Sequence, residues 1–293
     1  MLGRLWNTTV RVLRLVRFSH TIFALPFALG SMMVAAKNQH GWPGWRLLSL
    51  ILICMVLART AAMIFNRVAD WQIDQKNPRT AARHQLLPRP TAIAILLACA
   101  AGFVATTWRI NPLCFYLSPV ALGIIFLYSL TKRFTHFTQL FLGLALAVAP
   151  VGAWLAVTGA FAWPPLILAA GVLFWVAGFD LIYATQDVDF DRHEGLHSMV
   201  VWLGVDRSLW LALLFHVAMW ILLGAFAIVA GLGPIFGGAL VLIAAMLVYE
   251  HRVAATRDLA RINDAFFKAN AIVGLLFVSA ILLECVRPIS EAP

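Results

Sequence analysis

The chain has 293 residues, of which 62% are hydrophobic and only 12% are charged. This composition excludes an ordinary soluble domain and favours an integral membrane protein. The formal net charge of +9 suits basic loops beside anionic lipid or an anionic substrate, and we expect no nucleic-acid partner.

About nine long apolar segments follow one another, and such segments cross a bilayer as helices because a helix satisfies its own backbone hydrogen bonds in lipid. They are centred on residues 18–36, 46–66, 91–108, 112–130, 139–159, 164–184, 209–230, 235–249 and 269–286. The first has no evident signal-peptide cleavage site, so we expect it to be retained. The sequence therefore predicts an all-α bundle of about nine transmembrane helices, with a polar pocket facing the cytoplasm, in a single domain over residues 1–293.

The basic residues predict the orientation of this bundle. If the N-terminus lies in the cytoplasm, most Lys and Arg residues fall in cytoplasmic loops, and the outer loops receive only Lys37, Arg46, Arg109 and Arg287. Short cytoplasmic loops of membrane proteins are enriched in Lys and Arg. We therefore expect a cytoplasmic N-terminus.

Acidic residues gather in two windows at the predicted cytoplasmic ends of the second and sixth helices. The windows read NRVADWQID (residues 66–74) and YATQDVDFD (residues 183–191). In each window a polar residue and two aspartates are spaced four apart, which places them on one face of a helix. The residues so aligned are Asn66, Asp70 and Asp74, then Tyr183, Asp187 and Asp191.

These two windows predict a metal site. Carboxylate pairs that share a low-dielectric pocket repel each other unless cations lie between them. Carboxylate and amide oxygens suit Mg²⁺, which is commonly held together with the oxygens of a phosphate substrate. The alternative for one window alone is a solvated helix end, but two matching windows on one side of the membrane favour a pocket for a metal-bridged diphosphate.

Several basic residues stand between the windows. Arg79 and Arg83 follow the first window, and Lys132 and Arg133 connect the fourth and fifth predicted helices. Such groups can bind phosphate oxygens and stabilise a departing diphosphate. Each can equally be only a marker of the cytoplasmic side.

Arg59 lies within the second predicted helix, two turns before Asn66 on the same face. A charge at this depth is costly without a partner and is a functional candidate. A substrate carboxylate is one possible partner, and a backbone carbonyl or Asp180 is another.

The two windows resemble the signatures of the UbiA superfamily of intramembrane prenyltransferases, N-D-x-x-D-x-x-x-D and D-x-x-Y-A-x-x-D-x-x-x-D. The matching stretches here are residues 66–74 and 180–191. Further similar stretches are FSHTIFALPFAL (18–29), ARTAAMIFNR (58–67), NPRTAAR (77–83) and YSLTKRFT (128–135). The resemblance covers nearly the whole chain and is nearest to the 4-hydroxybenzoate polyprenyltransferase-like branch, which includes menaquinone futalosine-route members.

Two positions depart from the family pattern. Arg67 replaces an aspartate that often follows the asparagine, which removes a potential metal ligand and adds a cation. The stretch RHQLLPRP (83–90) lacks the common R-P-L-x-x-G pattern of the following loop. Neither departure removes an aspartate that the chemistry needs.

The resemblance implies Mg²⁺-dependent transfer of a polyprenyl chain from an allylic diphosphate to an aromatic acceptor such as 4-hydroxybenzoate, in ubiquinone or menaquinone biosynthesis. It implies a bacterial inner membrane, an active site on the cytoplasmic side, and lipid around the chain. The implied Mg²⁺ ligands are Asn66, Asp70, Asp74, Asp187 and Asp191, of which the aspartates are catalytic. The implied substrate-binding residues are Asn66, Arg59, Arg79, Arg83, Lys132, Arg133 and Tyr183. Tyr183 can orient an aspartate, stabilise a cation with its ring, or only pack.

Two other function classes share some of these features, namely zinc metalloproteases and ion-coupled carriers. His193, Glu194 and His197 form H-E-x-x-H, which binds zinc in metalloproteases when it lies on a helix with a third ligand nearby; here Gly195 interrupts it in a polar segment. An ion-coupled carrier also has intramembrane acids. A carrier would place them at the midplane, whereas these acids cluster at one face.

Overall fold

The computed structural model describes residues 23–37, 39, 41–76 and 88–286, without the side chains of Ile73, Asp74, Lys76 and Leu259. All regular elements in this part of the chain are helices. Their bounds are α2 Leu25–Lys37, α3 Trp45–Ala69, α4 Trp71–Lys76, α5 Arg89–Trp108, α6 Pro112–Thr131, α7 Thr138–Thr158, α8 Trp163–Ala184, η3 Thr185–Asp187, α9 Val188–His193, α10 Met199–Leu203, α11 Val205–Val229, α12 Pro234–Ala255 and α13 Leu259–Val286. Eight described helices are long and apolar enough to cross a membrane, and α2 is a shorter apolar helix. The predicted all-α membrane bundle is confirmed.

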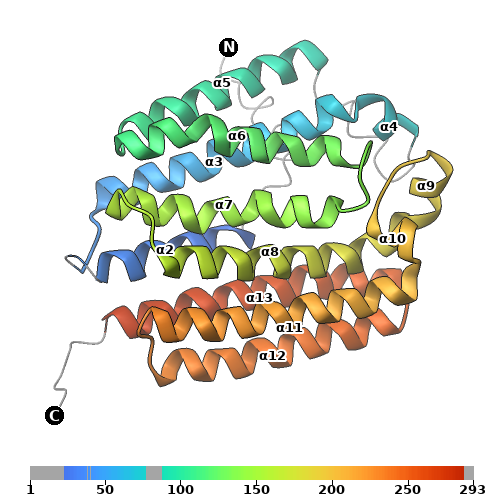
Figure 1. Ribbon diagram of the computed structural model, residues 1–293. Coiled ribbons are helices and arrows are strands. Elements are labelled where there is room, and N and C mark those ends of the chain that lie inside the picture. Colours follow the sequence, from blue (N-terminus) through green and yellow to red (C-terminus); the bar gives the residue numbers. More distant parts are fainter. Residues whose placement is uncertain (1–22, 38, 40, 77–87, 287–293) are drawn as a thin grey trace, which may run out of the picture.

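The long helices lie side by side in one bundle, and the short helices α4, α9 and α10 gather at one end of it (Figure 1). Helix α8 packs between α7 and α11, α2 packs against α7 and α13, and α3 packs against α5 and α6. The acidic windows therefore lie at the same end of the bundle, after α3 and after α8.

Aromatic side chains form the centre of the tightly packed half. Phe27 of α2 lies with its ring centroid 4.9 Å from that of Trp175 on α8 and 4.5 Å from that of Phe277 on α13. All three are fully buried. Because lipid is as apolar as these side chains, close packing rather than exclusion of water holds the helices together.

Proline and asparagine define where several helices begin. Proline stands in the first turn of α5, α6, α8 and α12, where its missing N–H costs no helical hydrogen bond. Asn111 caps α6 by accepting a hydrogen bond from the Cys114 N–H at 2.8 Å, and its amide donates to the Leu155 carbonyl at 2.8 Å. This residue therefore ties the start of α6 to the end of α7.

Each acidic window contains a break between two helical segments, instead of lying on one continuous helix. Helix α3 ends at Ala69, Asp70 has φ −93° and ψ 18°, and α4 starts at Trp71. In the second window the turn η3 separates α8 from α9. A 3₁₀ turn has three residues per turn instead of 3.6. The expectation that each window forms one continuous helical face is thus wrong, because each window is divided between helical segments.

The last two long helices extend beyond their predicted ends. Helix α12 continues past residue 249 to Ala255, and the buried Glu250 side chain in this part accepts a hydrogen bond from the Asn270 amide at 2.8 Å. Helix α13 starts at Leu259, and its first turns are polar; Lys268 pairs with Asp264 at 2.8 Å. Hydropathy does not detect such polar turns.

We predict that Gly143→Ala destabilises the bundle. A Cβ at Gly143 would overlap the backbone carbonyl of Leu173 on α8, and overpacking of this kind costs about 1–3 kcal/mol. The melting temperature in detergent should fall by roughly 2–10 °C. Gly123→Ala is the matched control, because a Cβ there meets nothing within 4 Å. Equal melting temperatures for the two variants would contradict the prediction.

Candidate active site

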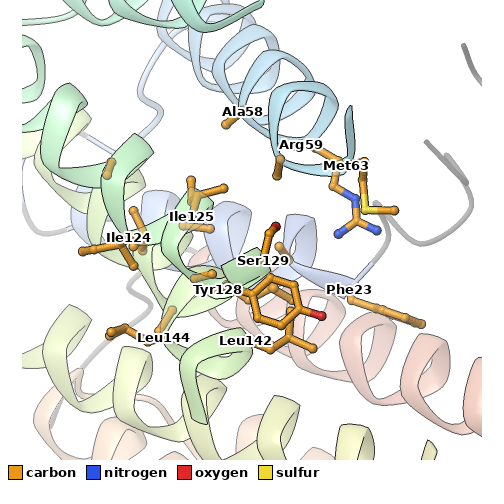
Figure 2. Close-up of a pocket in the computed structure, with 18 of the residues that line it drawn as sticks. Phe23, Ala58, Arg59, Met63, Ile124, Ile125, Tyr128, Ser129, Leu142 and Leu144 are labelled. Carbon is orange, nitrogen blue, oxygen red and sulfur yellow. The ribbon is translucent and has the colours of Figure 1, made fainter. Parts of the chain in front are cut away.

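A cavity of about 750 Å³ runs between α3, α5, α6, α7 and α8. Much of its polar lining comes from the helix ends that lie beside α4 and α9 (Figure 1), including Asn66, Asp70, Lys132, Arg133, Asp187 and Asp191. Elsewhere the lining is mainly apolar. Figure 2 shows Ile124, Ile125 and Leu144 on one side of the Tyr128 ring and Phe23 on the other. The cavity thus joins a charged end to a long apolar interior.

At the first acidic window, two residues position Asp70. The Asn66 amide donates to Asp70 Oδ2 at 3.4 Å, and the Arg133 guanidinium lies 3.2 Å from Asp70 Oδ1. The same guanidinium donates to the carbonyl of Ala69, the last residue of α3. Arg133 therefore satisfies a carbonyl that the broken helix leaves without its helical partner.

At the second window, Asp191 is only 2% exposed, and Lys132 Nζ lies 3.1 Å from its Oδ2. Burial lowers the pKa of Lys132, but Asp191, Asp180 and Asp187 together outweigh this and raise it above the ordinary lysine value. The ammonium therefore stays charged at neutral pH. Adjacent residues of the α6–α7 connection thus supply one cation to each acidic window.

The segment after α9 is tied to this connection. The His197 N–H donates to the Lys132 carbonyl at 2.8 Å, and the Met199 N–H donates to Gln139 Oε1 at 3.3 Å. Helix α9 ends at His193, and Gly195 has φ +67°. The H-E-x-x-H residues therefore do not share a helix. No group of three His, Cys, Asp or Glu side chains in the described chain could hold a metal ion by itself.

Arg59 is on α3, and its guanidinium points into the cavity beside Tyr128 (Figure 2). Its Nε is buried with no hydrogen-bond partner among the described residues. Asp180 also lines the cavity, but the ion pairs of the described residues do not include one between Asp180 and Arg59. The guanidinium is thus available to an anionic ligand.

Aromatic and hydroxyl groups complete the lining. Tyr183 lies with its ring centroid 4.7 Å from that of Phe266, and both residues line the cavity. Tyr128 and Ser129 also line it, although we did not predict them as site residues. The sequence contained one signal for Tyr128, namely its spacing. It stands one helical turn before Lys132, and residues so spaced are neighbours on a helix. The Ser129 hydroxyl is buried with no hydrogen-bond partner among the described residues.

Most predicted site residues meet at the cavity. These are Arg59, Asn66, Asp70, Lys132, Arg133, Tyr183, Asp187 and Asp191. The side chain of Asp74, together with Arg79 and Arg83, lies outside the described residues. The donor set at the charged end consists of carboxylate and amide oxygens, which fit Mg²⁺ when substrate oxygens complete the coordination.

Comparison with known proteins agrees with this architecture. The model of the UbiA prenyltransferase family matches residues 24–272. The 4-hydroxybenzoate octaprenyltransferase of Vibrio atlanticus (strain LGP32) is 31% identical over 90% of this chain and 92% of its own length. The enzyme of that name from Aromatoleum aromaticum (strain DSM 19018 / LMG 30748 / EbN1) is 30% identical over 92% of each chain.

Two solved structures share the fold. The apo structure of a UbiA homolog from Aeropyrum pernix K1 is 31% identical, with a TM-score of 0.81 over 90% of this chain and 97% of that chain. A UbiA homolog from Archaeoglobus fulgidus bound to GPP and Mg²⁺ is 22% identical, with a TM-score of 0.73 over 94% and 99% of the two chains. Since the family model spans most of the sequence and the helical bundle agrees with it, the chain belongs to the UbiA prenyltransferase family.

Proposed function

We propose that this prenyltransferase moves a polyprenyl chain from an allylic diphosphate to an aromatic acid such as 4-hydroxybenzoate, with Mg²⁺, in ubiquinone or menaquinone biosynthesis. The observation that carries the proposal is the single cavity that joins the acidic and basic groups to an apolar interior. A polyprenyl diphosphate has the same division into a charged head and an apolar chain. The names of the Vibrio and Aromatoleum relatives support the aromatic acid as acceptor.

The charged end suits the diphosphate. Asn66, Asp70, Asp187 and Asp191 would hold Mg²⁺ there, and Asp74 is proposed with them from its place in the motif. The bound metal would neutralise the diphosphate as it leaves. GPP and Mg²⁺ are named for the Archaeoglobus homolog. Lys132 and Arg133 add positive charge beside the same carboxylates, and Arg79 and Arg83 stay predicted contributors.

Arg59 is the residue that we propose binds the carboxylate of the acceptor. Its guanidinium points into the cavity (Figure 2), several turns from the charged end along α3. A guanidinium binds a carboxylate through two parallel hydrogen bonds. Held in this way, the ring of a hydroxybenzoate would lie between Arg59 and the diphosphate.

The reaction breaks the bond between the first carbon of the chain and the diphosphate oxygen. The electron pair leaves with the diphosphate, and the allylic cation that forms is attacked by an electron-rich ring carbon. That carbon then loses its proton to the released diphosphate. The apolar lining excludes water, which would otherwise capture the cation. The Tyr183 ring is one group that could stabilise the cation.

The membrane setting is part of the proposal. The eight described spanning helices and the bacterial relatives support an integral protein of a bacterial inner membrane. The distribution of Lys and Arg supports a cytoplasmic side for the charged end and for the N-terminus. A water-soluble diphosphate head would then meet the cytoplasm while its chain stays among the helices and lipid.

We predict that Asp70→Ala and Asp187→Ala each lower kcat at least about 100-fold, because each removes a carboxylate from the metal and diphosphate site. Covalent product from a polyprenyl diphosphate and 4-hydroxybenzoate is measured by mass spectrometry. Asp206→Ala is the control, since this aspartate is exposed and pairs with Arg257. Full activity in either site variant would contradict the proposed site.

Removal of divalent metal should stop turnover, because the negative charge that develops on the departing diphosphate is then no longer neutralised. A chelator followed by dialysis is expected to abolish product formation, and Mg²⁺ is expected to restore it. Glu194→Ala should remain active under the same conditions. Proteolysis that is lost in Glu194→Ala and on chelation of zinc would favour the metalloprotease interpretation instead.

For Arg59→Gln we predict a loss that depends on the acceptor. A hydrogen-bonded charge pair contributes about 1.5–3 kcal/mol, so kcat/KM for 4-hydroxybenzoate should fall roughly 10- to 150-fold. Acceptors without a carboxylate should lose far less. Arg46→Gln, an exposed arginine that donates to the Arg109 carbonyl, serves as the control. An equal loss with both kinds of acceptor would remove Arg59 from carboxylate binding.

A further inference from the structure

Gly152 on α7 lines the cavity, and a Cβ placed there would meet nothing within 4 Å. Gly143 on the same helix differs, because a Cβ there would overlap the Leu173 carbonyl. Close packing of α7 against α8 thus explains Gly143 and does not explain Gly152. Glycine is unfavourable in a helix interior, so an open glycine facing a cavity leaves space that any larger residue would occupy.

The position of Gly152 along the cavity follows from α7. The first turn of α7 belongs to the charged end, since Gln139 accepts the Met199 N–H there. Gly152 is thirteen residues further, which at a rise of 1.5 Å per residue is about 20 Å. Two other lining residues near the turn between α7 and α8, Phe161 and Leu166, are 57% and 40% exposed. The cavity therefore reaches an exposed apolar surface of the bundle in this region.

A polyprenyl chain is long compared with this distance. Each isoprene unit adds four carbon–carbon bonds, or about 5 Å of extended length. The stretch from the charged end to Gly152 thus accommodates about four units. A longer chain whose diphosphate occupies the charged end has to continue past Gly152 or leave the cavity before it.

We propose that Gly152 is a specificity-determining residue, where long prenyl chains cross α7 on their way from the cavity to the lipid. The absence of a side chain there permits donors longer than about four units. A bulky residue at this position would close the passage and restrict the enzyme to short donors. This inference rests on the proposed function, because it takes the charged end as the diphosphate site.

The test is a set of variants, Gly152→Ala, Gly152→Leu and Gly152→Phe, assayed with C10, C20 and C40 diphosphates and 4-hydroxybenzoate. Products are quantified by mass spectrometry, and the ratio of kcat/KM for C40 to that for C10 is compared with wild type. Gly123→Phe on α6 is the matched control. A Cβ at Gly123 also meets nothing within 4 Å, but this glycine is not among the residues that line the cavity.

For Gly152→Phe we expect the C40 to C10 ratio to fall at least about tenfold, because several methylene groups lose their burial. The C10 rate should stay within about twofold of wild type, Gly152→Leu should be intermediate, and Gly123→Phe should keep the wild-type ratio. An unchanged ratio in Gly152→Leu and Gly152→Phe, or an equal shift in Gly123→Phe, would overturn the role of Gly152. If Gly152→Phe does not fold, Gly152→Leu decides. A wild-type protein that forms no product from any donor contradicts the proposed function instead.

Discussion

The charged end of the cavity depends on pairing each acidic window with a cation. A buried carboxylate without a partner is costly, and several carboxylates in one pocket also repel each other. Lys132 bonds Asp191 and Arg133 bonds Asp70, so each window has one carboxylate that is paired with a cation. The connection between α6 and α7 is therefore the element that allows two acidic helix ends to share a cavity inside a membrane protein.

The cavity itself follows from uneven packing. Helix α8 is buried along most of its length, whereas α3 is buried along little of it. Helices α7, α8 and α11 pack closely, as the contact between Gly143 and Leu173 illustrates. The space opens where α3, α5 and α6 face α7. The helices α7, α8 and α11 thus form the closely packed half of the bundle. The half that contains α3, α5 and α6 leaves room for an apolar chain.

Much of this architecture could be predicted from the sequence. Long apolar segments require spanning helices, and the repeated acid spacing indicated where the charged end lies. The breaks at Asp70 and at η3 could not be predicted, because they depend on partners distant in sequence, such as Arg133 at the Ala69 carbonyl. The extension of α12 likewise carries a bond between residues distant in sequence, Glu250 and Asn270. Hydropathy depends only on which residues follow one another in the chain, so it contains no information on such tertiary hydrogen bonds.

The two cations of the α6–α7 connection are neighbours in the sequence. Consecutive Cα atoms across a trans peptide are 3.8 Å apart, yet the side chains of Lys132 and Arg133 reach aspartates that belong to different helix ends. Two neighbouring residues thus join both acidic windows to one short connection. An insertion between these two residues would move one cation away from its aspartate, so the charged end depends on the length of this short connection as well as on its residues.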